Sequence, residues 1–195
     1  LMDRSQCSKD EILAIVREVV GSECRVRVAR GRVDEQARAR LRDAFSRGDL
    51  ATWRYGEERA AQATDPRTIL AHARSVLCIA FPYATPEPAH PPLSGRVSNY
   101  AWSRDYHLRV LSTLHRVAER IDERARAAVT AVVCDTKPLA ERAFAARSGL
   151  GWIGRHTNLI SPELGSYVYL GEIVTTLALE PDAPLRKSCG ACTRC

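Results

Sequence analysis

Three cysteines near the end of the sequence have the spacing of a metal-binding motif. Cys189, Cys192 and Cys195 lie in the segment SCGACTRC, each separated from the next by two residues. This run is typical of bacterial ferredoxins, in which cysteine thiolates hold an iron–sulfur cluster. Zinc sites more often use two separated C-x-x-C pairs. We therefore predict an iron–sulfur cluster whose fourth ligand lies on chain beyond Cys195, and we expect the sequence to be part of a longer protein.

The other four cysteines have no such spacing. Cys78 and Cys134 lie in apolar segments and are predicted to be buried thiols, while Cys7 and Cys24 give no signal. No apolar run approaches the ~20 residues that cross a bilayer, and the first residues lack the apolar region of a signal peptide. We expect a cytoplasmic protein with no membrane partner, whose cysteines are thiols or metal ligands rather than disulfides.

An aspartate at the end of a predicted buried strand is the best candidate for acid–base chemistry. Asp135 follows the apolar run VTAVVC and begins the segment DTKP. In open α/β sheets, ligands bind beyond the carboxyl ends of the strands. On position alone, Asp135 is as well explained as the cap of the next helix, so both roles stay open here.

A glycine-rich segment follows Asp135. The stretch SGLGWIGRHTNLI holds Gly149, Gly151 and Gly154 around Trp152. Glycines at this density let a backbone approach a ligand and present its N–H groups. The spacing is that of a dinucleotide-binding loop, but here it follows a helix instead of opening one after a strand. It is therefore weak evidence for NAD, and a broad, flat cofactor fits the segment better.

The first half of the chain alternates between helical and extended patterns. Ser8 and Glu11 form a capping box for a predicted helix that ends at Gly21, and CRVRVA alternates like a half-buried strand. Asp34 is expected to cap a second helix that ends at Gly48. The run SVLCIAFPY is predicted to be a strand buried on both faces.

The second half continues this alternation after a Pro-rich stretch at 84–95. A long helix is predicted from about Asp105 to Arg126, and Pro138 is expected in the first turn of another that ends at Gly149. The segment SYVYLGEIVTTLALE supplies one or two late strands. The positions predicted to face the core are Ala37, Leu41, Ala44 and Phe45 in the second helix, and Leu108, Leu111, Leu114, Val117 and Ile121 in the long one. The whole pattern predicts an α/β sandwich.

Composition sets broad limits on the class of protein. The 195 residues are 45% apolar and 27% charged, as in an ordinary globular protein with one sizeable domain and room for a small appendage. The net charge of +6 leans towards a polyanionic partner. On charge alone, however, solvated helix faces account for the scattered arginines better than a binding surface does.

Five segments, taken in order, resemble the epoxyqueuosine reductases, which are cobalamin-dependent iron–sulfur enzymes of tRNA wobble-base modification. The resemblance covers roughly residues 50 to 195, and it joins a long central motif to the cysteine triplet. Ser103 departs from the family pattern, since a glycine is common there. The segments are DPRTILAHARSVLCIAFPY, NYAWSRDYH, CDTKPLAERAFAARSGLGWIGRHTNLI, GSYVYLGEI and CGACTRC.

The resemblance implies a reaction, its cofactors and its partners. Epoxyqueuosine, at the wobble position of tRNA with a GUN anticodon, would be reduced by two electrons to queuosine. Residues 1–180 would form a cobalamin-binding α/β domain like that of reductive dehalogenases. Residues 181–195 would begin a ferredoxin-like domain that holds two [4Fe–4S] clusters when complete. We expect a monomer supplied by an external electron donor, and we expect the 195-residue chain alone to be inactive.

The resemblance also assigns roles to single residues. Asp135 matches the proton donor and a cobalamin contact, and Arg59 matches an arginine at the polar rim or phosphate-bearing tail of cobalamin. A surface helix arginine is the alternative for Arg59. His107, in the NYAWSRDYH motif with Tyr100 and Tyr106, is expected to cap or pack rather than to bind cobalt. The other expected cobalamin contacts are Ser98, Gly151, Trp152, Thr157, Asn158 and Leu170, and the expected cluster ligands are Cys189, Cys192 and Cys195.

Two other classes of function remain open at this point. One is a reductive dehalogenase-like enzyme that uses the same cofactors on a small molecule. Those enzymes are usually exported with a twin-arginine signal, which is absent from this sequence. The other is a truncated, non-catalytic fragment that binds a cofactor or transfers electrons.

Overall fold

A four-stranded sheet forms the centre of the molecule. The computed structural model describes residues 7–194. The strands lie in the order β1-β2-β6-β3, and each neighbouring pair is antiparallel. A separate two-stranded ribbon joins β4 to β5. The strands are β1 (Arg25–Arg30), β2 (Ser75–Pro82), β3 (Thr130–Val133), β4 (Trp152–Ile153), β5 (Leu159–Ile160) and β6 (Val168–Thr175).

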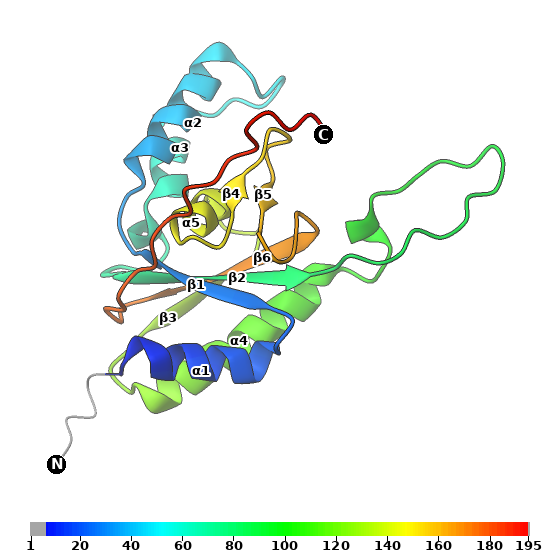
Figure 1. The fold of residues 1–195 in the computed structure, drawn as a ribbon. Helices are drawn as coiled ribbons and strands as arrows, with labels where there is room; N and C mark the ends of the chain where they lie inside the picture. Colours follow the sequence, from blue (N-terminus) through cyan, green and yellow to red (C-terminus); the bar gives the residue numbers. More distant parts are fainter. Residues whose placement is uncertain (1–6, 195) are drawn as a thin grey trace.

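Helices cover both faces of this sheet (Figure 1). On one face lie α1 and α4, which pack against each other; α5 lies on the other face, with α2 and α3 beyond it. Two apolar clusters fill the layers, one between the sheet and the α1/α4 pair and the other between the sheet and α5. The helices are α1 (Lys9–Val20), α2 (Glu35–Arg47), α3 (Glu57–Thr64), α4 (Tyr106–Arg124) and α5 (Glu141–Arg147), with short 3₁₀ turns η1 (Pro66–Thr68) and η2 (Asn99–Ala101).

Most of the predicted elements and their end signals are confirmed. Ser8 and Glu11 form the predicted capping box, and Asp34 caps α2 through the N–H of Ala37. Strand β2 is buried on both faces along Ser75–Ala80, as its unbroken apolar run predicts. The late segment forms one strand, β6, whose side chains alternate between the two apolar clusters.

Three details of the predicted helices are wrong. Helix α2 has no buried residue: Ala37, Leu41, Ala44 and Phe45 are only half-buried, because α2 packs on α3 rather than on the sheet. In α4, Leu108 is 71% exposed and Val110 is buried instead. Pro138 does not lie in the first turn of α5, because three short turns delay the start of that helix to Glu141.

The C-terminal ends of strands β2 and β3 lie at the same end of the sheet. Strands β2 and β3 both pair antiparallel with β6, so they run in the same direction and end on the same side. Asp135 leaves β3 at this end, and the aromatic residues that follow β2 and begin α4 lie beside it. Strand β1 is one lateral edge of the sheet. There Asp182 donates its N–H to the carbonyl of Val28 at 2.9 Å, so the chain after β6 runs along β1.

None of the helices in the described part of the chain, residues 7–194, combines the length and the apolar composition that crossing a bilayer requires.

Candidate functional site

Asp135 lies in a tight turn that its own side chain does not stabilise. Its φ is +56°, in the left-handed region that a residue with a Cβ rarely adopts. The N–H of Thr136 donates to the carbonyl of Cys134 at 2.6 Å and closes the turn around Asp135. Helix α5 begins at Glu141 with Ala140 as its N-cap. Asp135 is therefore not the cap of α5, and its carboxyl is left for another role.

The carboxyl of Asp135 is open to solvent and has two polar neighbours on α4. Its side chain is 65% exposed, and Oδ2 accepts a hydrogen bond from the Tyr106 hydroxyl at 3.3 Å. The Nε2 of His107 lies 3.5 Å from the same oxygen, while its Nδ1 lies 2.7 Å from Asp105. Partial burial by itself lowers the pKa of His107, but the hydrogen bonds and charges of Asp105 and Asp135 outweigh it and raise this pKa.

Aromatic rings form a stacked row next to this carboxyl. The ring of Tyr106 lies 4.1 Å from that of Tyr169 at an angle of 4°, and Tyr83 stacks on the other side of Tyr169 at 4.3 Å. His107 stacks on Tyr106 at 4.0 Å. Burial, followed by the charge of Asp135, raises the pKa of the Tyr106 hydroxyl, so it remains protonated and donates. The row places stacked aromatic side chains beside an acid.

Two glutamates lie behind Asp135. The N–H of Asp135 donates to Oε1 of Glu141 at 2.6 Å. Burial is the main cause that raises the pKa of Glu141 to about 7. Glu172, on β6, is fully buried, and burial together with the charge of Glu141 raises its pKa well above the ordinary range. Sequence analysis missed both residues, although the lone acid in the apolar run VYLGEIV was a usable signal.

The predicted cobalamin contacts differ in where they lie. Thr157 and Asn158 are exposed on the β4–β5 turn, which Arg142 of α5 joins by donating to the Thr157 carbonyl at 2.8 Å. Leu170 is half-buried in β6, two residues from Glu172 and on the same face. Ser98 is exposed just before η2. Leu170 lies in the part of β6 that pairs with the end of β2, while Ser98, Thr157 and Asn158 lie on loops that follow β2 and β4.

The glycine-rich segment is packed closely against its own chain. A Cβ on Gly151 would lie 2.5 Å from the Ile160 carbonyl oxygen, and one on Gly149, whose φ is +78°, would lie 2.2 Å from that of Ala183. Internal packing therefore requires glycine at both positions. The Nε1–H of Trp152 is buried with no hydrogen-bond acceptor among the described residues, so the chain leaves one donor unsatisfied there.

Within residues 7–194, Arg59 makes no hydrogen bond or ion pair with Asp135, Tyr106 or His107. It lies in α3, with its guanidinium 5.3 Å from the centre of the Tyr55 ring. The C-terminal end of α3 does contact the segment between Asp135 and α5, because the carbonyl of Ala63 accepts a hydrogen bond from the N–H of Ala140 at 2.7 Å. Arg59 lies at the other end of that short helix.

Two of the three predicted cluster ligands are described. Cys189 is half-buried and Cys192 is exposed, and a turn joins them through the Cys192 N–H and the Cys189 carbonyl at 3.0 Å. Arg155, from the β4–β5 turn, donates to the carbonyls of Gly190 and Cys192 at 3.0 and 3.2 Å. Cys195 lies outside the described residues. Within 7–194, no group of three metal-binding side chains is assembled.

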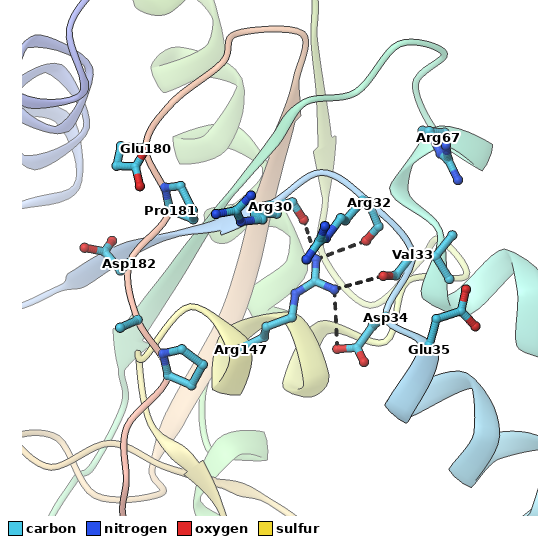
Figure 2. Close-up of a pocket in the computed structure, with 12 residues that line it drawn as sticks. Arg30, Arg32, Val33, Asp34, Glu35, Arg67, Arg147, Glu180, Pro181 and Asp182 are labelled. Atoms are coloured by element: carbon cyan, nitrogen blue, oxygen red, sulfur yellow. Dashed lines mark hydrogen bonds and ion pairs between the residues drawn. The ribbon is translucent and has the colours of Figure 1, made fainter.

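Asp135 lines neither of two large hollows in the surface. One, of about 1350 Å³, lies between α1, α4 and the chain around residues 82–85 and 99–105, beside the aromatic row. The other, of about 780 Å³, lies at the opposite sheet edge around Arg147 (Figure 2). The guanidinium of Arg147 donates to the carbonyls of Arg30, Arg32 and Val33, and Asp34 faces it at 3.7 Å. This second region is a structural junction, since the two terminal nitrogens of this half-buried cation bind three carbonyls, while its Nε–H has no partner among the described residues.

Comparison with known proteins points to one family. The family model described as "Epoxyqueuosine reductase QueG, DUF1730" matches residues 64–136. Proteins named epoxyqueuosine reductase are 41% identical over 134 residues in Synechocystis sp. and 37% identical over 163 residues in Gloeobacter violaceus. These matches cover 66% and 84% of this chain, and 45% and 50% of the relatives. The chain thus spans about half the length of the curated relatives it matches.

Solved structures agree. A selenomethionine-labelled epoxyqueuosine reductase superposes with a TM-score of 0.84 at 26% identity, over 95% of this chain and 50% of that protein. An epoxyqueuosine reductase in complex with an epoxyqueuosine-modified tRNA-Tyr stem loop gives 0.79 at 25% identity, with the same coverage. A reductive dehalogenase, described as B12-dependent, gives 0.53 at 17% identity over 95% of this chain and 22% of its own, and so shares the fold alone. Over the half of their length that it spans, the chain resembles the epoxyqueuosine reductases in both sequence and fold.

Proposed function

We propose that the chain forms the cobalamin-binding, proton-donating part of an epoxyqueuosine reductase that acts on tRNA in the cytoplasm. The observation that carries the proposal is the Asp135 carboxyl, exposed at the sheet edge beside Tyr106 and His107, within a segment that matches the family model. The reductive dehalogenase alternative is less favoured, because that likeness is confined to the fold. The α/β layers over residues 1–180 and a ferredoxin-like start over 181–195 are part of the same proposal.

The chain's own residues suit cobalamin in three ways. The stacked row formed by Tyr83, Tyr169 and Tyr106 lies beside Asp135 and offers aromatic edges against which a broad ring would pack. Trp152 offers a donor that the described chain does not satisfy, and corrin side chains carry amide acceptors. Ser98, Thr157 and Asn158 are exposed and polar, Leu170 would complete the wall, and Gly151, which is buried against Ile160, would support it from behind. Arg59 is proposed for the outer, phosphate-bearing part only.

The proposed chemistry needs an acid at Asp135. Reducing an epoxide to an alkene takes two electrons and two protons and expels the oxygen as water. Bound cobalamin would supply the reducing electrons at the epoxide. Asp135 would protonate the oxygen as its bonds to carbon break, and the Tyr106 hydroxyl orients that carboxyl by donating to Oδ2. A broad apolar ligand over Asp135 would remove water from the carboxyl and favour its protonated form.

The decisive assay uses the complete gene product that carries this sequence, purified without oxygen. With cobalamin, a chemical reductant and tRNA containing epoxyqueuosine, we expect loss of one oxygen atom from the wobble nucleoside, read by mass spectrometry, and no reaction without cobalamin. Halogenated phenols serve as the competing substrates. Dehalogenation in the absence of any change in the tRNA would overturn the proposal in favour of the dehalogenase class.

The electron-relay part of the proposal has its own measurement. Cys189, Cys192 and Cys195 would hold three irons of one cluster, and the fourth ligand would come from further chain. We expect two [4Fe–4S] clusters in the complete gene product and no stable cluster in the 195-residue chain. Iron and sulfide analysis of both tests this directly. Zinc in place of iron in the complete gene product would contradict it.

The cobalamin site can be tested on the 195-residue chain itself. Arg59, Asp135 and the exposed polar residues all lie within it, so we expect binding that is weaker than in the complete gene product. Titration with cobalamin, followed by the corrin absorption bands, measures both affinities. If the chain causes no spectral change at concentrations that saturate the complete protein, the essential wall of the pocket lies elsewhere.

A further inference from the structure

Two glutamates that the proposed chemistry does not use lie directly behind the Asp135 turn. Glu141 is the first residue of α5, and Glu172 lies in the middle of β6. Glu172 is fully buried, and in the sheet it lies between Cys78 of β2 and Val133 of β3. Neither of its oxygens has a hydrogen-bond partner at good geometry among the described residues. Ionising a fully buried carboxyl is costly, because burial removes the solvation of its charge.

The backbone of Asp135 connects this pair to the candidate site. Its N–H donates to Glu141 Oε1 at 2.6 Å, slightly shorter than the usual N–H···O distance, and a charged acceptor strengthens such a bond. Asp135 needs such an anchor, because its positive φ is unfavourable for a residue with a Cβ. Without Glu141, the turn would depend on the hydrogen bond between Thr136 and Cys134.

One shared proton would satisfy the pair. A protonated Glu172 can donate its O–H to Glu141, and an ionised Glu141 can accept both that bond and the Asp135 N–H. The reverse arrangement would place the negative charge on fully buried Glu172. Among the described residues whose charges act on the pair, His107 is the one that can be cationic, and its Nε2 lies 3.5 Å from Asp135 Oδ2. The titratable groups around Glu141 are Asp135, His107, Tyr106, Cys134, Cys78 and Glu172.

We propose that Glu141 is a positioning residue whose carboxylate holds the N–H of Asp135 and so fixes the direction of the Asp135 side chain, while Glu172 keeps the one proton that the two glutamates share. The inference rests on the proposed function for the use that Asp135 makes of this orientation. The hydrogen-bond arrangement itself is a property of the 195-residue chain and can be measured without any cofactor.

The test is a pH titration of the isotopically labelled 195-residue chain by NMR. We expect the Asp135 amide proton to resonate far downfield at high pH and to move upfield as Glu141 takes a proton, with a midpoint near its pKa of about 7. This measurement needs no substitution. An Asp135 amide that shows no step in the neutral range would overturn the proposal.

Three substitutions identify the group responsible. Glu141→Gln should abolish the step and shift the Asp135 amide upfield, because a neutral amide oxygen is a weaker acceptor. Glu172→Gln should preserve the downfield position, since its N–H₂ replaces the O–H donor. Glu119→Gln, exposed on α4, is the matched control and should change nothing. If Glu172→Gln removed the downfield signal in a folded chain, Glu172 would act through its charge. The proposal that the two glutamates share one proton would then be wrong.

The functional consequence is measured on the complete gene product. Glu141→Gln should lower the single-turnover rate on the order of 100-fold, the size expected when a reacting group is misplaced by about 1 Å. Cobalamin affinity should change little, because Glu141 is not among the proposed cobalamin contacts and its carboxyl binds the backbone of Asp135. Unchanged turnover by Glu141→Gln would overturn the positioning role. Absence of turnover in the parent as well would count against the proposed function, and the NMR result would still stand.

Discussion

The two ends of α5 hold buried ionisable groups in opposite ways. At its first residue, Glu141 accepts one backbone hydrogen bond and lies against Glu172, which has no partner at good geometry among the described residues. At its last residue, Arg147 donates to three backbone carbonyls and faces Asp34 (Figure 2). Burial raises the pKa of the glutamates and lowers that of the arginine, so each is pushed towards its neutral form.

The two ends of α5 show how a buried group that stabilises the fold differs from one that serves a functional site. Arg147 donates to three carbonyls and leaves only its Nε–H without a partner among the described residues, so it joins α5 to the chain after β1. The glutamates are compensated incompletely, and unfavourable burial of this kind concentrates at sites where chemistry needs it. The comparison therefore predicts that changes at the Asp135 end alter rate or pH response, whereas changes at the Arg147 end alter stability.

The largest effect is expected from Asp135→Asn in the complete gene product. The amide keeps the shape of the side chain and removes its proton, and loss of a general acid typically costs on the order of 100- to 10,000-fold in rate. Single-turnover conversion of epoxyqueuosine with pre-reduced cofactor isolates this step. Cobalamin and clusters should remain bound. Parental turnover by the variant would remove Asp135 from the chemistry, and loss of cobalamin would make it a binding residue.

Arg147→Met should lower stability and leave the Asp135 end intact. The substitution keeps much of the side-chain volume but strands three carbonyls and Asp34, which we expect to cost roughly 2–4 kcal/mol in the free energy of unfolding. Urea denaturation of the 195-residue chain measures this. Arg142→Met, at an exposed position with one hydrogen bond to Thr157, is the control and should cost less than ~1 kcal/mol. Equal losses would contradict the contrast between the two ends.

Glu172→Gln should change how stability depends on pH. Folded Glu141 and Glu172 have raised pKa values, so the folded chain binds more protons than the unfolded chain above pH ~4.5, and stability falls as pH rises. Each such group contributes a slope of about 1.4 kcal/mol per pH unit. Between about pH 5 and 7 the variant should lose stability less steeply by that amount. His107 contributes equally to both proteins, so it cancels in the difference. Parallel stability curves would show that Glu172 is not protonated on folding.

The smallest effect is expected from Tyr106→Phe. The change removes a 3.3 Å hydrogen bond to an exposed carboxyl and keeps the stacked ring. A bond of this kind contributes about 0.5–1.5 kcal/mol, so the single-turnover rate should fall by no more than about 10-fold. A loss as large as that of Asp135→Asn would instead make the Tyr106 hydroxyl a proton donor in its own right.

The sequence predicts elements better than it predicts their contacts. The capping signals at Ser8 and Asp34 act within one turn, and both are confirmed. The core face of α4 depends on its partner: Gly171 of β6 has no side chain, and this leaves room for Val110 and Leu114 to pack there. Helical periodicity alone could not place Val110 inside and Leu108 outside, because that choice is made by a glycine sixty residues away in the sequence.

The site follows the same rule. The sequence alone shows that Asp135 follows a buried strand and that the glycine-rich segment lies after the next helix. The conformation of Asp135 could not be predicted in this way, because it arises from three consecutive short turns and from Ala140, whose N–H is held by α3. The carboxyl pair could not be predicted either, since Glu141 and Glu172 meet only after β6 has paired between β2 and β3.

Strand β6 also limits where insertions can occur. Its residues alternate, so that Tyr169 and Gly171 face α4 while Leu170 and Glu172 face α5. One added residue before Tyr169 would reverse every later side chain, placing a carboxyl among the apolar residues of α4 and a tyrosine against α5. The loop at 84–95 can vary in length without this penalty, because it is exposed along its whole course. Among related chains, length variation should therefore collect in that loop and be absent from Val168–Thr175.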